Sequence, residues 1–145
     1  MDIALCVAAV FALISAAHLY WALGGRAGMI AAVPERPATA QATAASPLFT
    51  PSRASTIAVA LVLLLPALLV LACAGRISLP LPQPVLQWVV AGAAGVMFLR
   101  AVGEGHWVGL FKRVRGTRFA TLDTWVYSPL CVLLGAGMLA VAFGA

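Results

Sequence analysis

The side chains able to do chemistry in this chain collect near one end of its apolar segments. His18 lies about five residues past the middle of the first segment, and Arg100 about six residues past the middle of the third. Asp123 and Tyr127 begin the fourth segment at a similar depth. An arginine inside a bilayer costs a few kcal/mol, so it should face the interior of a helical bundle and meet a carboxylate. Glu104 and Asp123 are the carboxylates nearest to Arg100 in depth.

Helical spacing predicts which of these groups share a face. Arg100 and Glu104 stand at i and i+4, so they can pair along one helix, and Asp123 and Tyr127 have the same spacing. We therefore expect one polar pocket that holds a headgroup through Arg100 and His18, with the carboxylates setting their charge state. The expected ligand-binding residues are His18, Tyr20, Trp21, Arg100, Glu104, Asp123 and Tyr127.

A purely structural interpretation of the same residues stays open. Arg100 can extend to the lipid headgroups, Glu104 can form a surface pair, and Asp123 can simply cap a helix. His18 can hydrogen-bond a neighbouring carbonyl as a packing device. Aromatic residues of the type found at membrane interfaces flank the apolar segments, namely Tyr20, Trp21, Trp107 and Trp125.

The sequence favours neither a metal nor a cofactor. A haem held by His18 and His106 would need two histidines at one depth, and His18 is several residues deeper. Cys6, Cys73 and Cys131 show no ligand spacing, although Cys6 and Cys73 are close enough in depth for a disulfide to remain an alternative. No phosphate-binding loop, nucleophile elbow or zinc motif is present in the sequence. We expect no cofactor.

Four apolar segments must position these groups. The chain has 145 residues, of which 63% are hydrophobic and 9% charged, and a soluble fold of this size could not bury so much apolar surface. We expect an all-α, polytopic membrane protein, a single four-helix bundle over residues 1–145. The expected helices cover about 3–23, 51–74, 85–103 and 124–143, with loops at about 26–50 and 104–122.

Capping and turn residues set the expected boundaries. Thr50 before Pro51 predicts the start of the second helix, and Asp123 or Thr121 predicts the start of the fourth. The proline-rich run at residues 79–84 predicts a tight extended turn. The loop at 26–50 is either an ordered lid or a poorly ordered connector.

Charge predicts an orientation. The loops at 26–53 and 104–122 carry seven bases, Arg26, Arg36, Arg53, Lys112, Arg113, Arg115 and Arg118, whereas the opposite side has only Arg76. This asymmetry places both long loops in the cytoplasm and both termini outside, in a multi-pass protein of the cell inner (plasma) membrane. The net charge of +5 is scattered, which indicates attraction to lipid headgroups and argues against nucleic acid as a partner.

Several residue strings resemble a family of small bacterial membrane proteins catalogued as domain of unknown function 3995. The strings begin at Ser15 and His18, at Phe98-Leu99-Arg100, and at Gly109, and the last continues through Thr117 to Cys131. The resemblance covers essentially the whole chain and implies a compact four-helix membrane protein, with no reaction, substrate or partner attached. It also implies that His18, Arg100, Lys112, Asp123 and Tyr127 belong to the family's motifs. The resemblance also implies that relatives more often have Asp at the position of Glu104, which keeps the negative charge.

Three functions follow as hypotheses. The first is a binding module for a lipid-like or amphiphilic small molecule with one polar end, in a pocket of the cytoplasmic leaflet. The second is an intramembrane enzyme in which His18 and Glu104 or Asp123 act as an acid–base pair. The third is a structural or accessory subunit, and a transporter ranks below these because four helices would need to dimerise. The expected partners are the bilayer, a lipid or amphiphile, and a second copy in a homo-oligomer.

Overall fold

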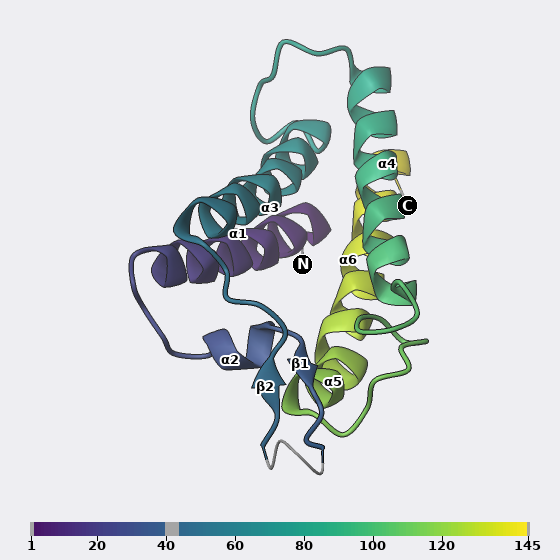
Figure 1. Cartoon of the computed structure of the whole chain (residues 1–145). Coiled ribbons are helices and arrows are strands. Elements are labelled where there is room, and N and C mark those ends of the chain that lie inside the picture. The colour runs from purple at the N-terminus through teal and green to yellow at the C-terminus, as the bar shows by residue number, and fades with distance from the viewer. Residues whose placement is uncertain (1, 40–43, 145) are drawn as a thin grey trace.

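A computed structural model of the chain describes residues 2–39 and 44–144 and is mainly helical (Figure 1). Three long helices are continuous: α1 (Ile3–Ala22), α3 (Arg53–Cys73) and α4 (Gln83–Val102). The fourth runs from Arg118 to Phe143 through α5 (Arg118–Leu122), the π-helical turn η1 (Asp123–Tyr127) and α6 (Ser128–Phe143). All four are long and apolar enough to cross a membrane. This confirms the expectation of four long apolar helices.

The second and third long helices do not begin where their sequence signals suggested. Ser52, not Thr50, caps α3, because its Oγ accepts a hydrogen bond from the Ser55 amide at 3.1 Å. α4 begins at Gln83, so the last two residues of the expected turn at 79–84 belong to the helix. Pro84 is tolerated there because a first-turn amide has no partner within the helix.

The fourth long helix begins at Arg118, inside the segment expected to be a loop. Thr117 caps it, since its Oγ1 accepts from the Ala120 amide at 3.1 Å. The expectation that Asp123 or Thr121 caps this helix is therefore wrong. The π-helical turn at Asp123–Tyr127 is wider than an α-helical turn, so Asp123 and Tyr127 do not keep the angular spacing of a straight helix.

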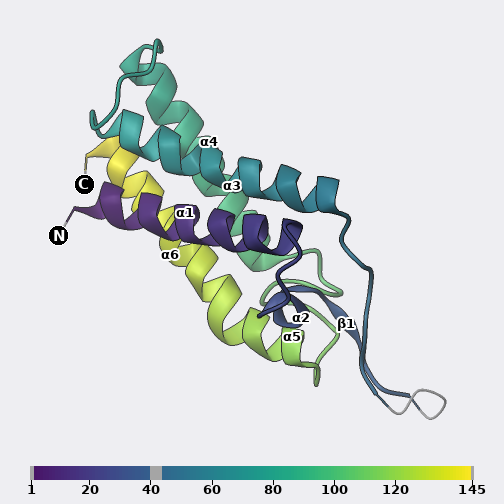
Figure 2. The ribbon, with the colours of Figure 1, turned by 90° about the vertical axis from the view of Figure 1, so that its left-hand side faces the viewer.

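The four long helices form two tightly packed pairs. In the α1–α3 pair, the Ser15 hydroxyl donates to the Ala60 carbonyl at 2.8 Å. A short side chain can reach the backbone of the other helix only where small residues let the two helices approach closely. In the α4–α6 pair, the Phe98 ring covers Gly135, where an added Cβ would lie 2.9 Å from the ring. Figures 1 and 2 show that the two pairs cross and diverge from each other.

The hydrophobic core lies where the two pairs meet, in one half of the molecule. The buried core residues come from the half of each helix that is nearer to the chain termini, except Ala94 and Leu134, which lie close to the middle of α4 and α6. The core residues are Ala4, Val7, Ala8 and Phe11 of α1, Ala67, Leu69, Val70, Ala72 and Cys73 of α3, Leu86, Val90 and Ala94 of α4, and Leu134, Met138 and Ala142 of α6. The other half of the bundle therefore depends on the loops to connect the two pairs.

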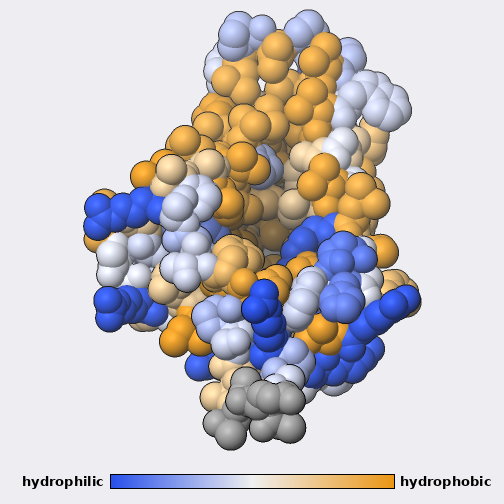
Figure 3. Space-filling model, in the orientation of Figure 1, coloured by the Kyte–Doolittle hydropathy of each residue, from blue (hydrophilic) through white to orange (hydrophobic). Residues whose placement is uncertain are grey.

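The ends of the molecule differ in character. Both termini lie at the same end as the loop at 74–82 (Figure 2), and Asp2 forms an ion pair there with Arg76. The opposite end, which we call the basic end, holds the segments at 23–39, 44–52 and 103–117 (Figure 2). Figure 3 shows hydrophobic residues over the helices, hydrophilic ones gathered at the basic end, and a hollow lined by hydrophobic residues between them.

The segment after α1 is folded at the basic end. It contains the short helix α2 (Met29–Ala32) and strands β1 (Glu35–Arg36) and β2 (Ser46–Pro47), which pair antiparallel. The Leu48 amide continues this pairing by donating to the Pro34 carbonyl at 2.8 Å. We call α2 and the two strands the lid. It is joined to the α1–α3 pair by its ends and lies beside α5 (Figure 1).

Candidate functional site

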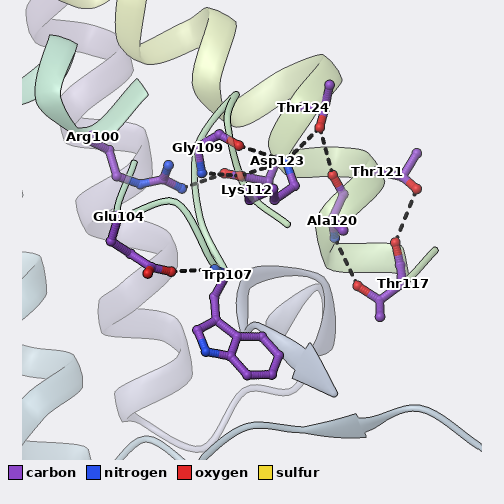
Figure 4. Close-up of polar contacts among 10 residues, drawn as sticks. All are labelled: Arg100, Glu104, Trp107, Gly109, Lys112, Thr117, Ala120, Thr121, Asp123 and Thr124. Atoms are coloured by element: carbon purple, nitrogen blue, oxygen red, sulfur yellow. Dashed lines mark hydrogen bonds and ion pairs between the residues drawn. The ribbon is translucent and has the colours of Figure 1, made fainter. Parts of the chain in front are cut away.

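Asp123 is the centre of a buried cluster that joins α4, the following loop and the fourth long helix (Figure 4). It is fully buried. One carboxylate oxygen accepts from Arg100 Nη2 at 2.7 Å, and the other accepts from the Gly109 amide at 2.7 Å and lies 3.1 Å from Lys112 Nζ. We call Asp123, Arg100, Gly109 and Lys112 the Asp123 cluster.

Lys112 is held as firmly as the carboxylate it faces. Its side chain is 1% exposed, and Nζ donates to the Gly109 carbonyl at 3.0 Å and to Thr124 Oγ1 at 2.6 Å. Two cations thus surround one anion, and Arg100 Nη1 is buried without a hydrogen-bond partner among the described residues. Because a lone buried charge is costly, each member of the cluster depends on the others.

Two glycines let the loop after α4 reach Asp123. Gly103 and Gly109 have φ values of +83° and +93°, which side chains other than hydrogen rarely allow. A Cβ on Gly103 would lie 1.8 Å from the Val108 carbonyl oxygen, and one on Gly109 would lie 2.3 Å from the Val102 carbonyl oxygen. The Leu110 amide then donates to the Ala101 carbonyl at 2.8 Å. The backbone crossing places the Gly109 amide on the carboxylate.

Glu104 does not pair with Arg100, and that prediction is wrong. α4 ends at Val102, so Glu104 lies beyond the helix where the i, i+4 argument no longer applies. Its carboxylate instead accepts from the amides of His106, at 3.2 Å, and Trp107. Figure 4 shows Arg100 extending toward Asp123 while Glu104 turns toward Trp107.

The lid is tied to the fourth long helix by two hydrogen bonds. Glu35 is buried, and its carboxylate accepts from the Phe119 amide at 3.2 Å. The Tyr127 hydroxyl donates to the Ala31 carbonyl at 3.0 Å. Since the lid is covalently part of the α1–α3 side, these bonds connect the two helix pairs at the basic end, where the core does not reach.

We expect Tyr127→Phe to loosen the lid without unfolding the bundle. Losing one neutral hydrogen bond costs about 1 kcal/mol, which corresponds to roughly fivefold more frequent opening. Hydrogen exchange of the amides from Ala31 to Glu35 should quicken by that factor. Tyr20→Phe is the matched control, because no hydrogen bond to the Tyr20 hydroxyl is present among the described residues and its ring is half exposed. Equal exchange in the two variants would contradict the tether.

A cavity of about 240 Å³ lies between the lid, the end of α1 and the start of α3. Its polar lining residues are His18, Arg53, Ser55 and Thr56, and its apolar ones include Trp21, Met29, Val33, Phe49 and Val59. No carboxylate from the described residues lines it. The volume is below the 300–1,000 Å³ typical of sites for whole small molecules, so the cavity suits a headgroup and the first part of a chain.

The hydrogen bonds around the cavity fix which groups remain for a ligand. His18 Nδ1 lies 2.8 Å from the Ile14 carbonyl oxygen of its own helix. A carbonyl only accepts, so Nδ1 carries the hydrogen and Nε2 of the neutral ring is an acceptor. The Trp21 indole, which meets the His18 ring edge-on with centroids 4.9 Å apart, donates to the Ala27 carbonyl at 2.7 Å.

The hydroxyl groups at the start of α3 are also committed. Ser55 Oγ and Thr56 Oγ1 donate to the Ser52 carbonyl at 2.9 and 2.8 Å. Their oxygens keep lone pairs but no hydrogens for a ligand. Among the described side chains that line the cavity, the Arg53 guanidinium is the donor left over, since no hydrogen bond or ion pair engages it.

The structure thus divides the seven predicted site residues between several places. Arg100 and Asp123 meet, as the charge argument predicted, but in a packed cluster. His18 and Trp21 line the cavity, Tyr127 ties the lid, and Glu104 caps its own loop. Tyr20 lies half exposed with its ring against Gly25. A single pocket that combines His18 with Arg100 does not form.

Several important residues were not predicted from spacing. Lys112 was given as a motif residue only by the family resemblance, and Glu35, Arg53 and Phe49 were not singled out as site residues. One sequence signal that could have drawn attention to Glu35 was the scarcity of acids, since the chain has only four Asp and Glu residues.

The three cysteines are free thiols, so Cys6 and Cys73 do not pair. Within the described residues, no group of three or more His, Cys, Asp or Glu converges on a metal position.

Four helices long and apolar enough to cross a membrane are typical of a small multi-pass membrane protein, and here a buried ionic cluster and a folded lid close one end of the bundle. The chain belongs to the family of proteins of unknown function DUF3995, which matches residues 11–138. The match extends from the middle of α1 into α6 and confirms the family resemblance. No curated protein and no solved structure matches the chain.

Proposed function

We propose that this protein binds a lipid-like amphiphile in the cavity beneath the lid, with the polar end of the ligand at the basic end of the bundle. The observation that carries the proposal is the lining of the cavity: an uncommitted guanidinium and an imidazole acceptor face a space walled mainly by apolar side chains. Sites for small molecules combine mainly apolar walls with a few polar groups that fix orientation.

The polar groups differ from those expected from the sequence. Arg53 takes the role expected of Arg100, because the Arg100 guanidinium is paired with buried Asp123. His18 and Trp21 keep their expected roles as headgroup partner and wall. The positive-inside distribution of bases supports a cavity in the cytoplasmic leaflet of the plasma membrane, with both termini outside.

The acid–base enzyme is less well supported. Such an enzyme needs a carboxylate within reach of His18, and none of the described residues supplies one to the cavity. Asp123 is enclosed by Arg100, Gly109 and Lys112, and Glu104 is engaged by backbone amides. Binding without chemistry is the function that this arrangement supports best.

A photoreactive phosphatidylglycerol, with a diazirine close to its glycerol carbons, tests the proposal in nanodiscs that contain the full chain. We expect labelling to concentrate on Trp21, Met29 and Phe49 of the cavity. Bilayer-exposed positions on α4, such as Trp88 and Leu99, which are 71% and 72% exposed, provide the background. Even labelling of both sets would show that the lipid only surrounds the protein, which would overturn the proposal.

A pair of substitutions on α3 sharpens this test. Val59→Trp should fill the cavity and reduce its labelling to the α4 background, because Val59 is part of the lining. Val62→Trp adds the same volume on the same helix, at a position that is 67% exposed and outside the lining, and should leave the labelling unchanged. Loss of labelling in both variants would contradict the assignment of the site.

A further inference from the structure

We propose that the cavity selects an anionic phospholipid whose headgroup ends in a free hydroxyl, such as phosphatidylglycerol. The inference rests on the proposed function, because it specifies the ligand of the same site. It follows from the inventory of donors and acceptors that the lining leaves unused.

The charge of the lining requires an anion and disfavours a zwitterion. Arg53 contributes a permanent positive charge, and no carboxylate from the described residues lines the cavity to neutralise it. A phosphate diester can accept hydrogen bonds from the planar guanidinium, often in pairs. The ammonium group of a choline or ethanolamine headgroup would find no anionic partner in the same space and would be repelled by Arg53.

The remaining polar groups of the lining present acceptors, which a ligand with a hydrogen to donate would satisfy. His18 Nε2 is an acceptor in the neutral ring, because the Ile14 carbonyl fixes the hydrogen on Nδ1. The hydroxyl oxygens of Ser55 and Thr56 offer lone pairs only, since both donate to the Ser52 carbonyl. Ser55 Oγ already uses one of its lone pairs, because it accepts from the Ser52 hydroxyl at 3.0 Å. A headgroup hydroxyl satisfies such an acceptor, whereas a phosphate diester without one leaves it unpaired.

The apolar part of the lining indicates where the acyl chains of the ligand begin. Trp21, Met29, Phe49 and Val59 form a wall that carries no uncommitted side-chain donor. About 240 Å³ is too small for two acyl chains. The headgroup and the glycerol carbons therefore occupy the cavity, while the acyl chains remain in the bilayer.

Competition against the photoreactive phosphatidylglycerol in nanodiscs tests the selectivity with the unmodified chain. The competitors are phosphatidylglycerol, phosphatidylmethanol, which has the same charge without the hydroxyl, and unlabelled phosphatidylcholine. We expect phosphatidylglycerol to reduce cavity labelling at roughly fivefold lower mole fraction than phosphatidylmethanol, the effect of one hydrogen bond. We expect phosphatidylmethanol to exceed phosphatidylcholine by about tenfold, the effect of a charge-assisted contact.

Two substitutions test which residue causes the preference for an anionic lipid and which causes the preference for a headgroup hydroxyl. Arg53→Gln should abolish the preference for anionic lipids, and His18→Phe should make phosphatidylglycerol and phosphatidylmethanol equal while both still exceed phosphatidylcholine. Arg36→Gln is the matched control, because Arg36 is exposed at the same end and lies outside the lining. It should leave both preferences unchanged, whereas a general attraction of lipids to the basic end would respond to both arginines alike.

The outcomes separate this inference from the proposed function. Equal competition by the three lipids, with labelling still concentrated in the cavity, would overturn the inference and leave the binding function standing. Absence of cavity labelling would overturn both. Competition by soluble glycerol 3-phosphate as effective as that by phosphatidylglycerol would show that the ligand is a water-soluble phosphate ester, and would overturn its assignment as a lipid.

Discussion

We expect Asp123→Asn to destabilise the protein by about 3–5 kcal/mol, because it removes the only anion from a buried cluster that holds two cations. The asparagine oxygen can still accept from the Gly109 amide, so the substitution isolates the charge. Lys112, whose side chain is 1% exposed, would then be buried without a counter-ion. Thermal unfolding of the purified protein in detergent, followed by circular dichroism, measures the loss.

Two further variants check that the cause is unbalanced charge. Glu104→Gln removes the carboxylate of an exposed residue in the loop after α4, and it should reduce the stability by less than about 1 kcal/mol. Adding Lys112→Met to Asp123→Asn removes the stranded cation and should restore more than half of the lost stability. A double variant no more stable than Asp123→Asn alone would show that the pairing is not what holds the cluster together.

We expect Gly109→Ala to destabilise the protein by about 2–4 kcal/mol, since it combines a left-handed backbone with a forced contact. At a φ of +93°, an added Cβ lies 2.3 Å from the Val102 carbonyl oxygen, and backbone cannot move aside as a flexible side chain would. Relieving the contact would pull the Gly109 amide from Asp123. Gly103→Ala should have a similar effect, because the two glycines approach each other across the same crossing.

Gly92→Ala is the matched control for the backbone crossing. Gly92 lies within α4, and an added Cβ there meets nothing within 4 Å. Alanine is the better helix former, so this variant should be as stable as the unmodified protein or up to about 1 kcal/mol more stable. If the Gly109 and Gly92 variants unfold at the same temperature, the crossing does not need glycine and our account of the loop is wrong.

The long helices could be predicted because their cause is local and repeated. A run of about 20 apolar residues has few alternatives to a spanning helix, whatever its neighbours are. The same argument placed His18 and Arg100 in one half of the bundle. It also predicted that Arg100 would find a carboxylate, and Asp123 is that carboxylate.

The division between the cluster and the cavity could not be predicted in this way. Depth along a helix says how far a residue lies from the membrane surface, but it does not say which helix pair lies opposite. His18 belongs to the α1–α3 pair and Arg100 to the α4–α6 pair, and these pairs diverge toward the basic end. A prediction from depth alone therefore combined two places that the fold separates.

The loops were the least predictable part because their contacts are distant in sequence. Glu35 accepts from the Phe119 amide, which lies far along the chain, and no periodic pattern relates the two. A shared property of the acids becomes visible only in the structure: Asp2, Glu35, Glu104 and Asp123 each accept a hydrogen bond from a backbone amide. In a chain with only four acids, every one organises the backbone.

The divergence of the two helix pairs also gives the molecule a tapered shape. The pairs pack directly on each other only in the half nearer to the termini, and at the basic end the lid and the loop after α4 fill the distance between them (Figure 1). In a bilayer, such a body displaces more lipid area from one leaflet than from the other. Its energy in a membrane therefore depends on leaflet asymmetry and curvature.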